Sequence, residues 1–323
     1  MRYVVIGAGA VGGTIGARLA EAGRDVVLVA RGRHLDVIRR RGLRLDDPDG
    51  SRTLAIPAVA SVDELDWRPG DVALLATKTQ DTEPILDALA AHVPDVVVAC
   101  AQNGVANERM AAARFARVQA VLVILPAEHY EPGVVIASSA PVPGVLDVGT
   151  YPTGTDDVSG AIAADLTAAG FSSKPDPAVM DGKYGKLLTN LGNAVEAACG
   201  RDDPAVADLL AAVTDEGERV LAAAGITART GDDDRVRRDG LITQRPVGGR
   251  ERGGGSSWQS LRRGTGSIEA EYLNGEIVAL GSAHGVATPV NAVMAGVAGE
   301  MAAAGEQPAS RRGADLLAAA QVS

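Results

Sequence analysis

The chain has 323 residues, enough for two domains that each bury a core of their own. Hydrophobic residues make up 46% of it, and the formal net charge is −10 at pH 7. This composition excludes disorder as the main state, and the negative charge argues against general nucleic-acid binding. No uncharged apolar run of about eighteen residues is present, so we expect no membrane span and no membrane partner.

The chain contains two cysteines, Cys100 and Cys199, whose wide separation gives neither a disulfide framework nor zinc-ligand spacing. Both lie in apolar, alanine-rich stretches and are expected to fill the core. The N-terminus lacks the basic region, apolar core and cleavage site of a secretory signal. These features predict a cytoplasmic protein, and none of them calls for a bound metal.

The first half of the chain alternates short apolar runs with segments of helical periodicity. Strands are expected at 3–6, 26–30, 72–76, 96–99, 118–125, 133–138 and 145–149. Helical spacing of apolar residues covers 12–23 and 81–92. Strands that alternate with helices predict a Rossmann-type, mostly parallel sheet, to which the later strands add an antiparallel extension.

The strand pattern stops after residue 175. Asp176 followed by Pro177 is typical of a helix start. Helices are expected at 178–199 and 204–224, then from 257 and from 267 to the end. The Gly-, Arg- and Asp-rich segment 230–256 is expected to be a flexible, solvated lid. The predicted fold class is α/β, with a Rossmann-type domain at 1–175 and an all-helical domain at 176–323.

The stretch "YVVIGAGAVG" places a G-x-G-x-x-G pattern between a strand and a helix. In this pattern Gly7 permits the tight turn, Gly9 lets the backbone approach a pyrophosphate, and Gly12 lets helix and strand pack closely. Together with Ala10 and Val11, these residues predict a dinucleotide site at the positive end of the helix. The alternative is a tight turn that binds no ligand.

The end of the second strand indicates which dinucleotide is bound. NAD-binding sheets usually place an acid there, whereas this chain has Ala30 and Arg31, with Arg33 nearby. A guanidinium binds a 2′-phosphate that a carboxylate would repel, so NADP(H) is the expected cofactor. The alternative is that both arginines are solvated loop residues.

Two further residues follow strands at the sheet edge where ligands bind. Lys78 comes directly after the strand at 72–76, and Asn103 follows the strand at 96–99. Lys78 is a candidate for holding a phosphate, and Asn103 for holding the nicotinamide ribose or the substrate. Either residue could equally be an ordinary loop residue.

The long helix carries a polar stripe. At about 100° per residue, Lys183, Lys186, Asn190 and Asn193 fall within one narrow arc. Lysine and amide side chains suit an oxygen-rich ligand, while a solvated helix face is the alternative. Further on, Ser257 opens a short helix and Glu269 lies in the first turn of the next; capping and dipole roles explain both equally well.

The motifs taken together resemble the ketopantoate reductase family over nearly the whole chain. The matching stretches are "GAGAVG", "LLATK", "QNGV", "KYGKLLTNLGNAVEA", "SSWQSLRRGTGSIEAEYLNGE" and "HGVATPVN". The resemblance implies NADPH-dependent reduction of 2-dehydropantoate to pantoate at a site between the two domains. It also implies Lys186 as the lysine general acid, Asn190 as its partner, Asn103 as the asparagine of the N-G loop, and Ser257 and Glu269 as substrate contacts, with Glu269 beside the lysine in catalysis.

One departure concerns the second asparagine of the family's helix motif, eight residues after the lysine. Ala194 occupies that position here, and Asn193 stands one residue earlier, about 100° away around the helix. The departure leaves open another 2-oxo acid or an imine as the substrate. A non-catalytic NADPH-binding sensor is an alternative of another class. The sequence leaves the oligomeric state open, and a homodimer is one outcome it allows.

Overall fold

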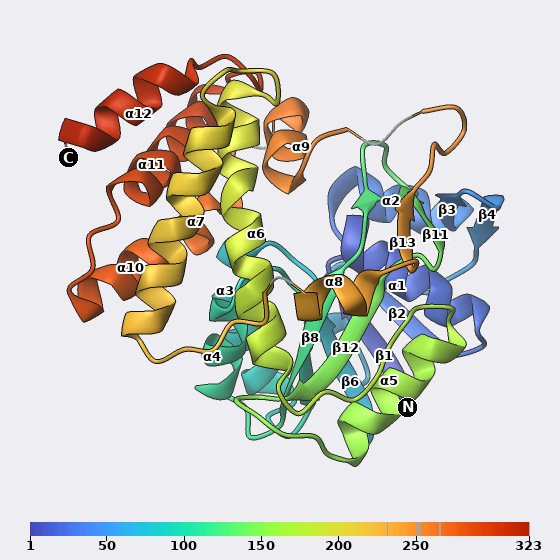
Figure 1. The fold of residues 1–323 in the computed structure, drawn as a ribbon. Coiled ribbons are helices and arrows are strands. Elements are labelled where there is room, and N and C mark those ends of the chain that lie inside the picture. The colour runs from blue at the N-terminus through green and yellow to red at the C-terminus, as the bar shows by residue number, and fades with distance from the viewer. Residues whose placement is uncertain (231, 251–252, 265, 323) are drawn as a thin grey trace. The chain divides into compact units, whose positions relative to one another are not determined.

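The computed structural model describes residues 1–230, 232–250, 253–264 and 266–322. It divides into two compact units, the first Met1–Lys183 with Gly231–Arg252 and the second Tyr184–Thr230 with Gly253–Ser323. Figure 1 shows sheets in the first unit and helices in the second. The division falls after Lys183, where sequence analysis expects it after residue 175, and the chain returns to the first unit at 231–252.

The main sheet of the first unit has seven strands in the order β12-β8-β7-β6-β1-β2-β5. The parallel strands are β1 (Arg2–Ile6), β2 (Asp25–Val29), β5 (Ala58–Val59), β6 (Asp71–Leu75), β7 (Val97–Cys100) and β8 (Val118–Ile124). Strand β12 (Val145–Thr150) pairs antiparallel with β8. The predicted α/β class, with its antiparallel extension, is confirmed. Since β2 and β6 lie on opposite sides of β1, the strand order reverses there, which is where such sheets bind ligands.

Helices cover both faces of this sheet. Tyr3 and Val5 of β1 belong to a core cluster with α1 (Ala10–Glu21) and α5 (Asp157–Ala168). Val4 and Ile6 belong to a cluster with α3 (Thr82–His92) and α4 (Ala106–Ala112) on the other face. Alternate residues of a strand point to opposite faces, so an uninterrupted apolar run is typical of a strand buried on both sides.

A second sheet lies in the order β4-β3-β10-β9, and sequence analysis missed most of it. Its strands are β3 (Leu43–Asp47), β4 (Gly50–Leu54), β9 (Ala127–Glu128) and β10 (Val134–Ala137). The chain enters it through α2 (Gly32–Arg41), a helix rich in arginine that was also missed. Leu43 and Leu45 are the buried apolar residues of β3, so the alternating signal is too short to identify a strand.

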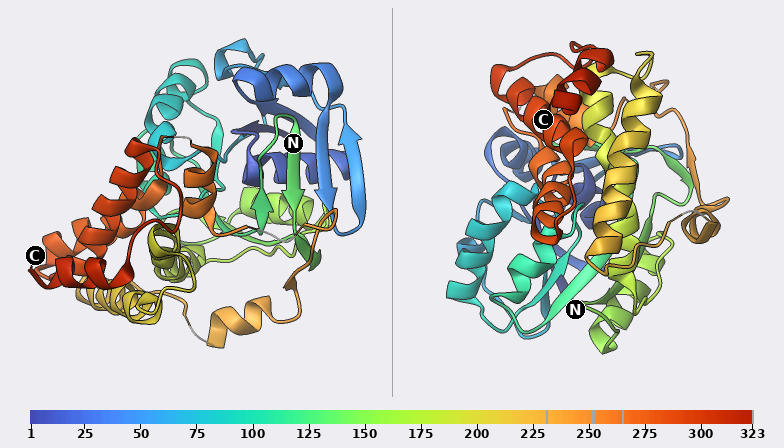
Figure 2. Two further views of the ribbon diagram at one scale, coloured as in Figure 1. Left: turned by 90° about the horizontal axis from the view of Figure 1, so that it is seen from above. Right: turned by 60° about the vertical axis from the view of Figure 1, so that its left-hand side comes forward.

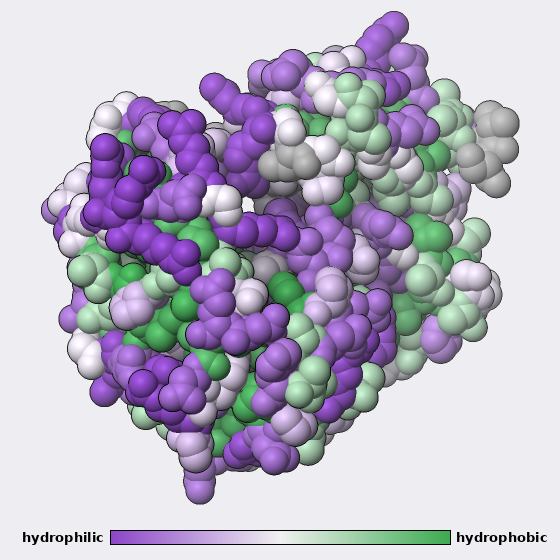
Figure 3. Space-filling model, turned by 180° about the vertical axis from the view of Figure 1, so that it is seen from behind, coloured by the Kyte–Doolittle hydropathy of each residue, from purple (hydrophilic) through white to green (hydrophobic). Residues whose placement is uncertain are grey.

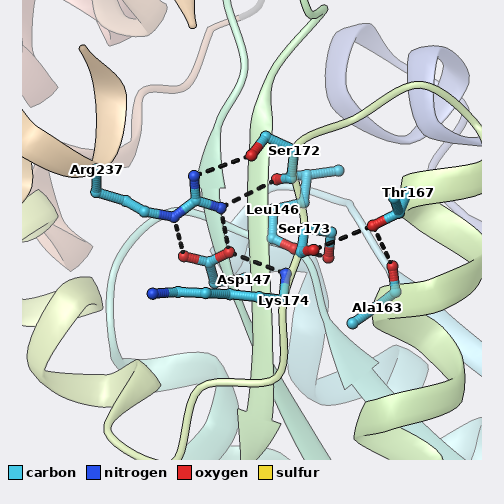
Figure 4. Close-up of polar contacts among 8 residues, drawn as sticks. All are labelled: Leu146, Asp147, Ala163, Thr167, Ser172, Ser173, Lys174 and Arg237. Atoms are coloured by element: carbon cyan, nitrogen blue, oxygen red, sulfur yellow. Dashed lines mark hydrogen bonds and ion pairs between the residues drawn. The ribbon is translucent and has the colours of Figure 1, made fainter.

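The segment 232–250 belongs to the first unit and is mostly exposed, as expected, but it contains regular elements that the predicted loop lacks. It contains α8 (Asp232–Arg238) and β13 (Ile242–Gln244), which pairs with β11 (Ser139–Pro141). Arg237 donates hydrogen bonds of 2.6 and 2.8 Å to the carboxylate of Asp147, which is fully buried in β12, and one of 2.9 Å to the hydroxyl of Ser172 (Figure 4). The expected irregular loop is therefore wrong for these residues, while the lid role stays a prediction; residues 231, 251 and 252 lie outside the described part.

The second unit is helical, as predicted. Its helices are α6 (Val179–Cys199, which begins in the first unit), α7 (Val206–Ala223), α9 (Ser256–Arg263), η3 (Glu269–Tyr272), α10 (Asn274–His284), α11 (Pro289–Ala304) and α12 (Gly313–Val322). Figure 2 shows the yellow-to-red helices grouped together, except for the gold-coloured α8, which belongs to the first unit. The buried Glu216 carboxylate of α7 accepts hydrogen bonds from the amides of Val290 and Asn291 and thereby satisfies the first turn of α11.

No helix in the described part of the chain is long and apolar enough to cross a membrane. Cys100 and Cys199 are free and buried, as expected of core fillers. Figure 3 shows apolar patches interspersed with polar surface on one face of the molecule. Among the described residues, the exposed large apolar side chains are Met1, Leu210 and Val236, which are far apart in the sequence.

Candidate functional site

The glycines after β1 differ in what surrounds them. Gly7 has φ of +98°, and a Cβ there would lie 2.8 Å from the amide nitrogen of Thr77. A Cβ on Gly12 would collide with the carbonyl oxygen of Gly7. At Gly9, by contrast, no heavy atom of the described chain lies within 4 Å of the Cβ position. Gly7 and Gly12 are therefore required by the fold, whereas the space at Gly9 is open to a ligand.

The open space lies at the start of a helix that has no protein cap. Gly9 is the N-cap of α1, no side chain caps the helix, and no acid stands in its first turn. Ala10 and Val11 are half-buried residues of that turn. A helix start with free amides and no carboxylate favours an anion, so these residues fit a diphosphate.

Arg31 stands where the sequence placed it, directly after β2 and at the N-cap of α2. Its side chain is 81% exposed and donates a hydrogen bond of 2.8 Å to Asp81, which follows β6. Exposed ion pairs contribute only about 0–1 kcal/mol, so the guanidinium can exchange this carboxylate for a phosphate at little cost. Arg33 is exposed as well.

Lys78 and Asn103 follow neighbouring strands of the sheet. Lys78 is the N-cap of the short 3₁₀ helix η2 (Thr79–Asp81) after β6, and Asn103 follows β7. Both side chains are half-buried. The main-chain carbonyl of Asn103 accepts a hydrogen bond of 3.1 Å from the side chain of Asn107 in α4. Because β1, β6 and β7 are adjacent and parallel, these loops and the glycine turn lie at one edge of the sheet.

His34 is a residue of this region that sequence analysis missed. Its Nε2 donates a hydrogen bond of 2.7 Å to the carbonyl of Ala8, inside the glycine turn, and its Nδ1 accepts one of 2.8 Å from the amide of Gly133. This pattern requires the neutral imidazole with its proton on Nε2. Burial lowers the pKa of His34, which favours the same neutral form. No pattern in the sequence marks this histidine.

The polar stripe of α6 is not a solvated face. Lys183 and Asn190 are only 3% and 4% exposed, and Lys186 and Asn193 are half-buried. Within the second unit, the Asn193 amide lies 3.5 Å from the hydroxyl of Ser256. The alternative of a helix face in water is therefore wrong.

The remaining predicted residues lie on the elements expected for them. Ser257 is in the first turn of α9 and 2% exposed, and its hydroxyl has no hydrogen-bond partner within the described chain. Glu269 opens η3 and is 7% exposed. A buried hydroxyl without a partner costs free energy, so Ser257 fits a ligand contact better than it fits a simple cap.

Both parts of the chain match models of one family. The model described as Ketopantoate reductase PanE/ApbA matches residues 3–152, and the model of its C-terminal domain matches residues 178–302. The chain belongs to the ketopantoate reductase family. It is an oxidoreductase of that family.

Individual members of the ketopantoate reductase family support this assignment. The 2-dehydropantoate 2-reductase of Pyrococcus horikoshii is 27% identical over 90% of this chain and 94% of its own length. The enzyme of the same name from Caulobacter vibrioides is 31% identical over 90% and 95%. A crystal structure of a PanE/ApbA family ketopantoate reductase from Ralstonia eutropha covers 94% of this chain and 99% of its own, with a TM-score of 0.78 and 27% identity.

An enzyme with a different name shares the fold. A ternary structure of D-mandelate dehydrogenase with NADH and anilino(oxo)acetate gives a TM-score of 0.80 at 20% identity and covers 94% of this chain and 99% of its own. At this identity the likeness concerns the fold alone. Since that neighbour holds NADH, membership of this fold does not distinguish the two nicotinamide dinucleotides.

Proposed function

We propose that this protein reduces 2-dehydropantoate to pantoate with NADPH as the hydride donor. The observation that carries the proposal is that relatives matched over about nine-tenths of both chains bear the name 2-dehydropantoate 2-reductase. The open Gly9 position and the uncapped start of α1 support nucleotide binding independently of those names.

NADPH is preferred over NADH because of the charge at the end of β2. Arg31 offers an exposed guanidinium in the place where NAD-binding sheets usually carry an acid. A 2′-phosphate would replace Asp81 as its partner and form charge-assisted hydrogen bonds. Lys78, half-buried after β6, is proposed to hold a phosphate, and Asn103 to hold the nicotinamide ribose or the substrate.

The chemistry is assigned to residues of the second unit. When bound, the nicotinamide supplies the hydride. Lys186 donates the proton to the carbonyl oxygen of the substrate, where negative charge develops as the ketone is reduced. Asn190 orients that carbonyl, and the unpartnered Ser257 hydroxyl binds the carboxylate of the oxo acid. Glu269 accepts a hydrogen bond from the substrate's hydroxyl group.

A different 2-oxo acid is a second candidate, and one observation favours it. Ala194, eight residues after Lys186, is 1% exposed and carries no hydrogen-bonding side chain. Asn193 lies beside Ser256 at the start of α9, next to Ser257 in the chain. A pocket that has lost one amide and gained another around the helix would bind a different substituent on the oxo acid.

Oxidation of NADPH on addition of 2-dehydropantoate, followed by absorbance, tests the function. Turnover is expected with the wild type and is expected to fall about 10²- to 10⁴-fold in Lys186→Ala, which lacks the general acid. Lys174→Ala removes an exposed lysine and serves as the matched control. Unchanged turnover in Lys186→Ala would reject its role. Turnover with another oxo acid in a panel would support the second candidate, and NADPH binding without any turnover would support the sensor.

A further inference from the structure

Lys183 has a role different from that of its neighbour Lys186. It is the last residue of the first unit and is 3% exposed. Its ammonium donates hydrogen bonds of 2.8 Å to the carbonyl of Gln102 and 3.2 Å to that of Val121, and lies 2.8 Å from the carboxylate of Glu108. An ammonium has three N–H donors, so these three contacts occupy all of them. Lys183 is therefore not available as a proton donor in a reaction.

The partner of this ammonium is a carboxylate with no access to water. Glu108 lies on α4 and is 0% exposed. Burial raises the pKa of its carboxyl group, and the Lys183 ammonium opposes that rise. Since desolvation of two charges offsets most of their attraction, a buried ion pair is weak evidence of stabilisation, and an apolar pair of similar volume is often as stable. The pair calls for another explanation.

One main-chain contact of Lys183 is made within β8, at Val121, and the other just beyond the carboxyl end of β7, at Gln102. Gln102, whose carbonyl it holds, directly precedes Asn103. The Gln102 side chain in turn donates hydrogen bonds of 3.1 Å to the carbonyl of Thr77 and 2.9 Å to the hydroxyl of Thr82. Thr77 directly precedes Lys78. A single buried residue thus joins the ammonium to both loops that carry the proposed nucleotide contacts.

Asn107 provides a second hydrogen-bonded link between the loops that carry Asn103 and Lys78. Its amide donates hydrogen bonds of 3.1 Å to the carbonyl of Asn103 and 3.3 Å to the hydroxyl of Thr79, and it accepts one of 2.8 Å from Thr82. The amide is fully buried. Because the links are hydrogen-bonded and pass through the buried side chains of Gln102, Asn107 and Thr82, a displacement of one loop is transmitted to the other.

We propose that Lys183 is a positioning residue, whose ion-paired ammonium fixes the main chain of Gln102 and so the loops that present Asn103 and Lys78 to the nucleotide. The inference rests on the proposed function, because it assumes that these loops hold NADPH. Lys186 follows three residues later on the same helix, about 4.5 Å along its axis, so the anchored turn of α6 directly precedes the proposed general acid.

The dissociation constant of NADPH, measured by fluorescence titration, tests the proposal without reference to any substrate. Lys183→Met removes the charge and both main-chain contacts, and we expect binding to weaken about tenfold or more. Arg2→Met is the matched control, because Arg2 and Asp71 form another buried ion pair of the first unit. That pair lies at the amino ends of β1 and β6, away from the proposed site. Arg2→Met should lower the melting temperature and leave the dissociation constant within about twofold.

The double variant Lys183→Met/Glu108→Leu separates positioning from stability. Replacing both charges removes the unpaired buried carboxylate, so the melting temperature should return towards that of the wild type. The affinity for NADPH should remain about tenfold lower, since nothing holds the Gln102 carbonyl. Recovery of full affinity in the double variant would overturn the proposal. A double variant that fails to fold would assign the pair to folding and overturn it as well.

The outcomes also distinguish this inference from the proposed function. If the wild type binds NADPH but reduces no 2-dehydropantoate, the assigned substrate is wrong, while the titration still tests Lys183. Wild-type affinity in Lys183→Met refutes the positioning role and leaves the reductase assignment intact. A wild type that binds no nicotinamide dinucleotide refutes both.

Discussion

Alanine substitutions at Gly9 and Gly12 are predicted to have different effects. Gly9→Ala should weaken NADPH binding, whereas Gly12→Ala should lower folding stability. In Gly9→Ala the new methyl group enters open space, and the backbone at φ −74° is accessible to alanine. The lower entropy of the unfolded chain favours the variant by about 0.4–1 kcal/mol. The poorer N-cap preference of alanine costs a similar amount. These terms cancel closely, so we expect a melting temperature within a few degrees of the wild type.

Binding should respond in the opposite way. In Gly9→Ala the methyl group occupies the place proposed for the diphosphate, and we expect the dissociation constant of NADPH to rise at least about tenfold, or 1.4 kcal/mol. In Gly12→Ala the methyl group meets the carbonyl of Gly7, and overpacking of this kind costs about 1–3 kcal/mol of folding stability. Calorimetry of both variants, combined with titration of NADPH, checks the pair. Wild-type affinity in a folded Gly9→Ala protein would show that no phosphate lies at the start of α1.

Two further predictions concern pH and the 232–250 segment. Burial lowers the pKa of His34 in the folded state, so the unfolded chain binds its proton first, and stability should fall as the pH drops below about 6.5, the unfolded value. Protonation of folded His34 would break the hydrogen bond that its Nδ1 accepts from Gly133, so NADPH affinity should fall only at a lower pH. Both profiles should be flatter in His34→Gln. An equally steep profile in that variant would assign the effect elsewhere. Arg237→Met leaves the fully buried Asp147 without its guanidinium and should cost about 3–5 kcal/mol by denaturant unfolding, whereas Asp147→Asn should cost less, because Arg237 can turn towards water. Equal losses would contradict this asymmetry.

The sequence predicts structure best where a buried element leaves a continuous run of apolar residues. The strands of the main sheet are predictable because residues such as Val4 and Val5 are buried on opposite faces and form continuous apolar runs. The hairpin at 43–54 has one short buried face and is not recognisable. The attachment of 232–250 also escapes prediction, because it depends on Arg237 meeting a carboxylate from a distant strand.

In the candidate site too, residues marked by a local motif were predicted, whereas contacts between distant residues were not. The glycine turn and Arg31 are local signals and lie where they were predicted. Lys183 was grouped with Lys186 by helical spacing, although its ammonium is fully engaged by main chain and Glu108. Amino-acid composition contains a further signal that sequence analysis did not use. The chain has four lysines and 27 arginines, and the two side chains are not interchangeable. The rarity of lysine therefore marks each of its four positions for closer inspection.

The course of the chain has a consequence for how this protein is synthesised. The first unit includes 231–252, so its last elements leave the ribosome only after α6 and α7 of the helical unit have been made. Until then Asp147 lacks its arginine and β11 lacks the strand that pairs with it. A fragment truncated at Lys183 would have the same defects permanently, so the first unit cannot be obtained intact and free of the helical unit by a single cut in the gene.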